Sequence, residues 1–371
     1  MTARMTIYDI ARLAGVSKST VSRVLTNSSR VDKETVKRVR QVMEEHNYIP
    51  SLHASSLKGK NQFIGIVVPR LNWSMMPDIF LGVSDIIDES PYEVVLFTES
   101  NAPDYQEVIE RLQVNRLVAG LLVVPNTPIP DDMVKLPQKG IPVVLMNLLG
   151  FPSLLPRVSS DNAGGVREAV RYLISLGHTR IAYIHGGSEF PCSQERYEGY
   201  CAALREANIE VTDTFYFPGS FDYIDGTHAI EAIVQMPVES RPTALFASND
   251  IEAYGALKRA EELQLHIPED LALIGFDDIP PSIYTRPALT TVKQPFQELG
   301  QCATDLLLSL LDPERPFPDR WHQQAVRIQP EPSSSMSLNI MDLRLPTPLV
   351  IRESAGNKIP SKSSNSPATL G

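Results

Sequence analysis

From residue 63 onward, short apolar runs alternate with stretches that have the apolar spacing of an amphipathic helix. Seven of these runs have the length of buried strands, and they begin at residues 63, 93, 118, 141, 180, 243 and 271. Helical patterns lie between most of them, for instance over residues 161–177 and 249–263. Alternation of this kind is typical of parallel sheets built from βα units. Seven strands suit two such sheets better than one, so we expect an α/β core of two doubly wound subdomains.

The length and composition agree with a globular protein of two or three domains. The chain has 371 residues, and its hydrophobic content of 43% is ordinary for a packed core. No basic segment followed by an unbroken apolar run opens the sequence, and no apolar run reaches the ~18 residues of a membrane span. We therefore expect a cytoplasmic protein.

The sequence carries no recognisable constellation for catalysis or for metal binding. Its three cysteines, Cys192, Cys201 and Cys302, have neither the even number of a disulfide framework nor the CxxC spacing of a metal or redox site. We expect them to be reduced and mostly packed in the interior. No GxSxG, HExxH or P-loop motif occurs either, so we predict no enzymatic activity, no metal and no cofactor.

Charge is distributed unevenly along the chain. Residues 1–60 contain 11 Lys or Arg and 5 Asp or Glu, a net charge of +6, which leaves 23 against 39, or −16, for the remainder. A basic head on an acidic body predicts a head that contacts a polyanion and a body that does not.

The basic head reads as a small bundle of three helices. Thr6 and Ser17 stand where each can cap a short helix, and Gly15 between them suits the turn that ends the first. A third helix follows from about residue 32 to residue 47. The outward face of the second helix is rich in hydrogen-bond donors and nearly free of carboxylates, as a helix in the DNA major groove should be. The alternative is a generic three-helix bundle with a solvated polar face.

Three motifs of the head, "TIYDIARLAGVSKSTVSRVLTN", "NYIP" and "HASSLKGK", resemble the lactose repressor family of bacterial transcription factors. The resemblance implies a helix-turn-helix domain in which Lys18, Ser19 and Arg23 read base edges. It also implies phosphate contacts from Thr6, Tyr8, Ser17, Thr20, Ser22, Asn27 and Tyr48. Because Lys18 and Arg23 both suit the O6 and N7 atoms of guanine, we expect a G·C pair in each half-site.

The segment after the head resembles the family's hinge, which becomes helical on operator DNA. In that reading Ala54 lies in the minor groove and Leu57 wedges into the central base step. The alternative is a plain interdomain linker. Two residues depart from the family pattern: Thr26 stands where Asn is usual, and Ser55 where Arg is usual. The second departure removes a phosphate contact, which Lys58 and Lys60 could replace.

The body continues the resemblance through "DNAGG", "ERYEGY", "ALFASNDIEAYGAL" and "LALIGFDD". It is similar to periplasmic sugar-binding proteins, whose ligand lies in a cleft between two subdomains. The expected organisation is a helix-turn-helix domain (1–48), a hinge (49–61), an effector-binding and dimerisation core (62–354) and a disordered tail (355–371). Within the core we assign 62–160 and 291–322 to the DNA-proximal subdomain, and 162–288 and 323–354 to the distal one. Residues 329–342, rich in Pro and Ser, are read as a surface insertion.

Five residues are predicted to contact an effector because they follow strands, at the sheet edge where ligands of α/β proteins bind. Family members place binding groups at the positions of Arg196, Phe221, Asn249 and Asp277, and Trp73 is added for its aromatic face. Each has a structural alternative: a surface salt bridge for Arg196, a loop cap for Asp277, a helix N-cap for Asn249, and simple packing for Phe221 and Trp73.

These features predict a ligand-responsive transcriptional repressor that binds a pseudo-palindromic operator as a homodimer. We expect a small-molecule effector, a sugar by default, to control DNA affinity from the cleft. In one alternative the fold is the same, but a nucleobase corepressor or a partner protein controls the affinity for DNA. Another is a solute-binding protein, against which the basic head and the absence of an export signal both argue.

Overall fold

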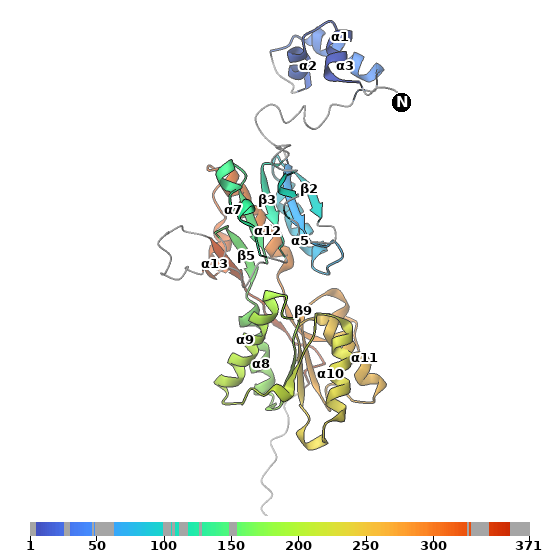
Figure 1. Ribbon diagram of the computed structural model, residues 1–371, viewed down its shortest axis with the longest axis vertical. Coiled ribbons are helices and arrows are strands. Elements are labelled where there is room, and N and C mark those ends of the chain that lie inside the picture. Colours follow the sequence, from blue (N-terminus) through green and yellow to red (C-terminus); the bar gives the residue numbers. More distant parts are fainter. Residues whose placement is uncertain are drawn as a thin grey trace, which may run out of the picture.

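The computed structural model describes residues 5–25, 30–46, 48, 63–98, 105, 108–110, 118–125, 128–147, 154–324, 326–327 and 341–356. These residues form a helical head and a core of two α/β subdomains (Figure 1). The predicted fold class, a small all-α head joined to an α/β core with two sheets, is confirmed.

The head contains α1 (Ile7–Leu13), α2 (Lys18–Leu25) and α3 (Lys33–Glu45). Thr6 begins α1 with a capping box, in which its side chain accepts from the backbone of Asp9 and the Asp9 side chain accepts from the backbone of Thr6. Gly15 has a φ of 64° in the turn that follows, a conformation that glycine adopts without strain. Apolar side chains of all three helices, with Ile10, Val21 and Val39 at the centre, form the core of this bundle.

The first subdomain is built on a sheet with the strand order β11-β12-β5-β4-β3-β1-β2. The strands are β1 (Phe63–Val68), β2 (Glu93–Thr98), β3 (Gly120–Val123), β4 (Val143–Met146), β5 (Arg157–Ser160), β11 (Val326–Arg327) and β12 (Asp342–Leu345). All pairings are parallel except that of β11 with β12. The long helices α5 (Met76–Ile87) and α12 (Phe296–Leu311) pack together against one face. The short α7 (Asp131–Val134) contributes Met133 to the opposite face, and α13 (Asp319–Gln324) follows α12.

The second subdomain has the strand order β13-β10-β9-β8-β6-β7. Its strands are β6 (Ile181–Ile184), β7 (Tyr216–Phe217), β8 (Ala244–Ala247), β9 (Ala272–Asp277), β10 (Thr290–Lys293) and β13 (Leu349–Val350). Helices α8 (Asn162–Ser175) and α9 (Pro191–Glu206) cover one face, and α10 (Tyr223–Gln235) and α11 (Asp250–Glu262) cover the other (Figure 1). Successive side chains of β8 point to opposite faces of the sheet: Phe246 packs under α8 and α9, while Leu245 packs under α10 and α11.

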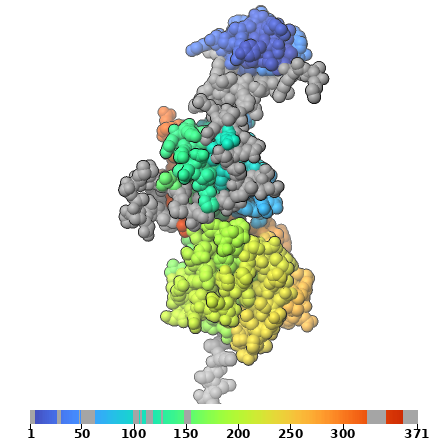
Figure 2. All heavy atoms as spheres, viewed as in Figure 1, coloured from blue at the N-terminus to red at the C-terminus, as the bar shows by residue number. Residues whose placement is uncertain are grey.

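Three chain segments cross between the two subdomains, which form separate lobes in Figure 2. They join β5 to α8, β10 to α12, and β12 to β13. The carboxyl ends of β1 and β4 in one sheet and of β6, β8 and β9 in the other therefore lead into loops that share the space between the lobes. This is the sheet edge at which α/β proteins bind ligands.

Part of the predicted division of the core is wrong. Strands β11 and β12 lie within the segment 323–354 assigned to the distal subdomain, but β12 pairs in parallel with β5 of the first sheet. Arg157 of β5 reinforces this pairing with an ion pair of 2.5 Å to Asp342. Conversely, all but the first residue of β10 falls within the segment 291–322 assigned to the first subdomain, yet β10 pairs with β9 of the second sheet. All seven predicted strands are present. Most of the 329–342 insertion and residues 357–371 of the predicted tail lie outside the described residues. The predicted tail begins too early, because Ala355 is buried in the core of the second subdomain.

Candidate functional site

The outward face of α2 carries a connected polar surface. Lys18 Nζ donates to Tyr8 Oη at 3.1 Å and lies 4.7 Å from the centre of the Tyr8 ring, which is 65% exposed. Ser17 Oγ accepts from the backbone N–H of Thr20 at 3.1 Å and lies 2.7 Å from Ser19 Oγ. These side chains present donors and acceptors to solvent from the start of the helix, in the arrangement of a helix that contacts DNA.

The other residues predicted to contact DNA differ in their surroundings. The Thr6 hydroxyl already donates to Asp9 Oδ2 at 2.7 Å, so its first role is to cap α1. Ser22 and Arg23 belong to α2, and the Arg23 side chain is exposed. Tyr48 packs against the bundle core, where burial raises the pKa of its phenol. Asn27, Ala54 and Leu57, together with Thr26 and Ser55, lie outside the described residues.

A cleft of about 440 Å³ lies between the two subdomains, and all five predicted effector residues line it. Trp73 comes from the loop after β1, while the other four come from the second subdomain. Other side chains at the wall were not predicted: Arg70, Asn72, Met75, Asn147, Phe190, Cys192, Ser220, Ile251, Gln294 and Phe296. Several of these follow a strand by one or a few residues, which is the signal that could have identified them. This volume lies in the ordinary range for a small-molecule site.

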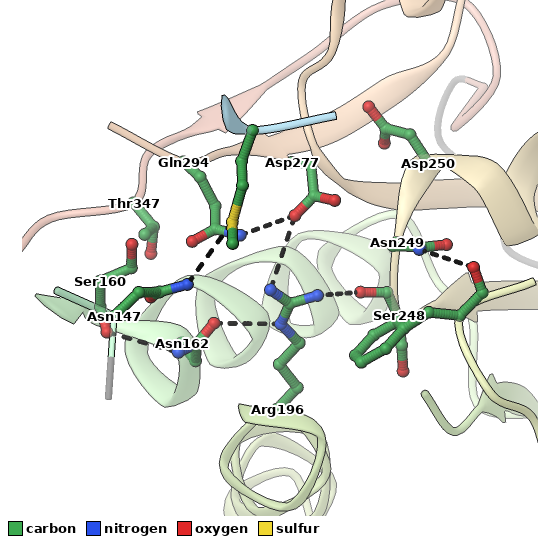
Figure 3. Close-up of polar contacts among 12 residues, drawn as sticks. Asn147, Ser160, Asn162, Arg196, Ser248, Asn249, Asp250, Asp277, Gln294 and Thr347 are labelled. Carbon is green, nitrogen blue, oxygen red and sulfur yellow. Dashed lines mark hydrogen bonds and ion pairs between the residues drawn. The ribbon is translucent and has the colours of Figure 1, made fainter. Parts of the chain in front are cut away.

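Arg196 of α9 is the best-anchored residue of the cleft (Figure 3). Only 3% of it is exposed, and its Nε donates to Asn162 Oδ1 at 3.0 Å. Its Nη1 donates to the carbonyl of Ser248, and its Nη2 lies 3.5 Å from Asp277 Oδ1. A guanidinium has five N–H donors, so N–H groups on both Nη atoms remain beyond these three contacts. The predicted alternative, a surface salt bridge, does not fit a side chain this deeply buried.

Asp277 ends β9 and turns its carboxylate toward Arg196 and Gln294 (Figure 3). Its φ of 114° lies in the left-handed region that non-glycine residues rarely adopt. Gln294 Nε2 donates to Asp277 Oδ1 at 2.7 Å. Burial raises the pKa of Asp277, and Arg196 and Gln294 oppose that rise. The carboxylate can therefore accept hydrogen bonds from hydroxyl groups of a ligand.

Phe221 has a φ of 64°, and side chains of Asn249 and Glu252, at the start of α11, hydrogen-bond to its backbone. Asn249 Nδ2 donates to the Phe221 carbonyl at 3.1 Å, and Glu252 Oε1 accepts from the Phe221 N–H at 3.2 Å. The ring lies 5.3 Å from Phe190 and 5.3 Å from the Arg196 guanidinium carbon. Gly186 makes room for it, because a Cβ there would lie 2.1 Å from a ring carbon.

Asn249 lines the cleft, as predicted, and is also the helix N-cap of its structural alternative. At the start of α11 its Oδ1 accepts from the Glu252 N–H at 2.8 Å. Its cap contact and its bond to Phe221 use one of the two lone pairs on Oδ1 and one of the two N–H donors on Nδ2. Asn249 therefore shapes the wall of the cleft at least as much as it offers groups to a ligand.

Two buried carboxyl groups at the start of α11 support the loops of the cleft. Asp250 accepts from the Ile279 N–H at 3.0 Å and from the hydroxyls of Ser282 and Thr291, which fixes the loop after Asp277. Glu252 supports the Phe221 loop from the other side. Burial, reinforced by neighbouring carboxylates, raises the pKa of each of these two groups to about 8. Neither residue was predicted from the sequence, because an acidic first turn is also an ordinary feature of helices.

No group of His, Cys, Asp and Glu that could hold a metal ion occurs in the described part of the chain. Among those same residues, no helix has the length and apolar character needed to cross a membrane.

The raised pKa values predict a pH dependence of stability. A carboxyl whose pKa rises from ~4.3 in the unfolded chain to about 8 in the fold stabilises the protein fully below the lower value and progressively less as pH rises to the upper one. Glu252→Gln should therefore reduce the fall in melting temperature between pH 5 and pH 8. Calorimetry of this variant beside Glu269→Gln, which alters an exposed carboxyl, tests this, and equal pH slopes in both variants would contradict it.

Comparisons with known proteins assign the chain to a family. Residues 6–51 match the model of bacterial regulatory proteins of the lacI family, and residues 170–330 match the periplasmic binding protein-like domain. The ribose operon repressor of Escherichia coli K12 is 33% identical over 82% of this chain and 92% of its own length. The probable HTH-type transcriptional repressor ExuR of Bacillus subtilis is 33% identical over 84% of this chain and 93% of its own.

Solved structures agree with these sequence matches. The lac repressor dimer bound to operator and the anti-inducer ONPF superposes with a TM-score of 0.73 at 27% identity, covering 95% of this chain and 99% of that one. The complex of the transcriptional regulator CelR with cellobiose gives a TM-score of 0.64 at 29% identity, covering 95% and 100%. With a helix-turn-helix head, a two-lobed core and relatives matched over most of their length, this chain belongs to the lacI family of bacterial regulatory proteins.

Proposed function

We propose that this chain is a transcriptional repressor whose affinity for operator DNA is set by a small molecule bound in the cleft between its subdomains. The observation that carries the proposal is the cleft itself, where a buried arginine, a strand-end carboxylate and aromatic faces converge in about 440 Å³. The basic head supplies the DNA-binding surface, with Lys18 and Tyr8 at its exposed face. Relatives named as repressors support the direction of regulation. A DNA-binding role places the protein in the cytoplasm and requires no catalysis.

The chemistry of the cleft favours a sugar. Arg196 can donate two parallel hydrogen bonds to vicinal hydroxyls, and Asp277 can accept from hydroxyls. The rings of Trp73, Phe190 and Phe221 line the same space and offer flat apolar faces to the C–H side of a pyranose. The same faces suit a nucleobase, which remains the alternative ligand class.

Exposed apolar side chains support a homodimer. Large apolar residues remain exposed in both subdomains, on α5 and β2 of the first and around the start of α10 and residues 283–284 of the second: Leu81, Val94, Leu96, Tyr223, Ile224, Ile283 and Tyr284. Clusters of this kind mark protein interfaces. One short recognition helix reads few base pairs, whereas two heads related by a twofold axis read a pseudo-palindromic operator.

Lys18 provides a test of base reading. An operator selected from random DNA should lose about 1–3 kcal/mol of binding free energy on Lys18→Ala, while binding to unrelated DNA weakens less. Fluorescence anisotropy at a fixed salt concentration measures both. Lys37→Ala removes an exposed lysine of α3 in the same head and should affect the two DNAs alike. An equal loss on both DNAs with Lys18→Ala would remove Lys18 from base recognition.

Arg196 provides a test of the effector site. A thermal-shift screen of the full chain against sugars, sugar phosphates and nucleobases identifies ligands, because a bound ligand raises the melting temperature.

Arg196→Lys keeps a positive charge beside Asp277 but cannot form a planar fork. We expect it to weaken ligand binding about ten- to a hundredfold, the effect of a lost charge-assisted hydrogen bond, and to leave operator affinity of the ligand-free protein unchanged. Arg205→Lys, an exposed position of the same helix, is the control, and unaltered ligand affinity in Arg196→Lys would exclude the proposed role.

A further inference from the structure

An ion pair joins the two subdomains beside the cleft. Glu195 belongs to α9 of the second subdomain, directly before Arg196, and Arg344 belongs to β12 of the first sheet. Arg344 Nη2 donates to Glu195 Oε1 at 3.4 Å, and the two side chains are only 24% and 14% exposed. The distance between the two groups therefore changes whenever the subdomains move relative to each other.

Glu195 and Arg344 form one of the two hydrogen bonds that a carboxylate and a guanidinium can share. Among the described residues, Glu195 Oε2 and Arg344 Nε are both buried and have no hydrogen-bond partner. A buried polar atom without a partner is costly, so such atoms call for an explanation. The Asn162 amide lies close enough to oppose the rise that burial causes in the pKa of Glu195, but Arg344 has the larger effect. The carboxylate is therefore a charge whose main support is an arginine at long range.

The two unpartnered atoms are the ones that a complete fork would join. Nε and Nη2 lie on one edge of a guanidinium and match the two oxygens of a carboxylate in a bidentate pair, with N···O distances of about 2.7–2.9 Å. Shortening the present Nη2–Oε1 contact of 3.4 Å by roughly half an ångström would bring it to the length of a charge-assisted hydrogen bond, and a bidentate fork would also require Nε to face Oε2. By contrast, Arg157 and Asp342, which lie on paired strands of one sheet, are already 2.5 Å apart. Arg196 and Asp277, within the second subdomain, are also 3.5 Å apart, so the Glu195–Arg344 pair is distinguished by crossing between the subdomains and not by its length.

The surroundings of the pair connect it to the cleft and to the crossing segments. Asn162, at the start of α8, accepts from Arg196 Nε at 3.0 Å and donates to the Ser160 carbonyl at 3.4 Å. The hydroxyls of Ser159 and Ser160, in the strand that leads into this crossing, are likewise buried without a partner among the described residues. Polar groups left incomplete at a crossing segment are what a hinge with a second arrangement would show.

We propose that Glu195 and Arg344 form a latch between the subdomains, a single long contact in the arrangement described here and a bidentate fork when the cleft closes. Closure that brings a ligand onto Arg196 also moves Glu195, because the two residues are neighbours on α9. The latch would thus favour the closed core independently of the ligand's identity. The inference rests on the proposed role of the cleft as the effector site.

Distances between the subdomains test the latch in the full chain. Spin labels on a genetically encoded keto amino acid at Lys139 and Glu168, exposed positions of the first and second subdomains, report the separation by pulsed electron paramagnetic resonance. Dilution with unlabelled chain keeps each measurement within one protomer. We expect two populations in the otherwise unaltered protein, and at least about a tenfold loss of the closed one in Glu195→Gln and in Arg344→Lys, the change expected from one charge-assisted hydrogen bond.

Two controls make the result specific. Glu198→Gln alters an exposed carboxylate on the same helix and should leave the distances unchanged. The double exchange Glu195→Arg with Arg344→Glu restores a pair and should recover part of the closed population. Distance distributions in Glu195→Gln and Arg344→Lys that match the unaltered protein would overturn the latch. The distance measurement uses neither DNA nor ligand. Unchanged distances in the variants would therefore reject the latch without rejecting the proposed function. Conversely, a protein that bound no operator would reject the proposed function without affecting the measured distances.

Discussion

The buried guanidinium of Arg196 is the contact on which the arrangement of the cleft depends. A charge with only 3% exposure is stable only with partners, and Arg196 finds them on α8, at the end of β8 and at the end of β9. These three contacts tie together the segments that form one wall of the cleft. Around them, Asp250 and Glu252 fix the two neighbouring loops through backbone N–H groups. The wall is therefore organised in advance of any ligand, which lowers the entropic cost of binding.

The topology explains how a change in this wall can affect a distant head. The two sheets are separate packing units, and the described part of the core connects them through three crossing segments and a few contacts such as Glu195 with Arg344. A ligand that touches both lobes favours one relative orientation of the subdomains, because its contacts differ between orientations. The head is a small independent bundle with its own core, so it can be carried as a unit by the first subdomain.

Local patterns predicted most of the fold. The seven apolar runs became strands, and the helices between them kept the predicted spacing. Six of these strands are buried parallel strands, which have few polar positions, whereas β2 lies at the sheet edge with Val94 and Leu96 exposed. The placement of β12 failed, since its pairing with β5 joins residues far apart in the sequence, such as Arg157 and Asp342, which are 185 residues apart. Two-residue strands such as β13 carry too little pattern to be recognised at all.

Part of the candidate site was also predictable from local sequence patterns. Residues at strand ends, such as Asp277, were found because strand ends of α/β folds meet at one edge. Asn147 and Gln294 follow β4 and β10 in the same way, but neither was singled out from the sequence. The supporting role of Glu252 depends on its contact with the Phe221 backbone across 31 residues, which no local pattern encodes.

The central claim is that occupancy of the cleft changes affinity for DNA. The direct measurement is an operator titration of the full chain, followed by fluorescence anisotropy, with and without a saturating ligand identified by thermal shift. The account predicts that the ligand changes the dissociation constant for operator about 5- to 150-fold, the usual range of coupling between two sites, and that operator changes ligand affinity by the same factor. Superimposable operator titrations in the presence of a demonstrably bound ligand would contradict it.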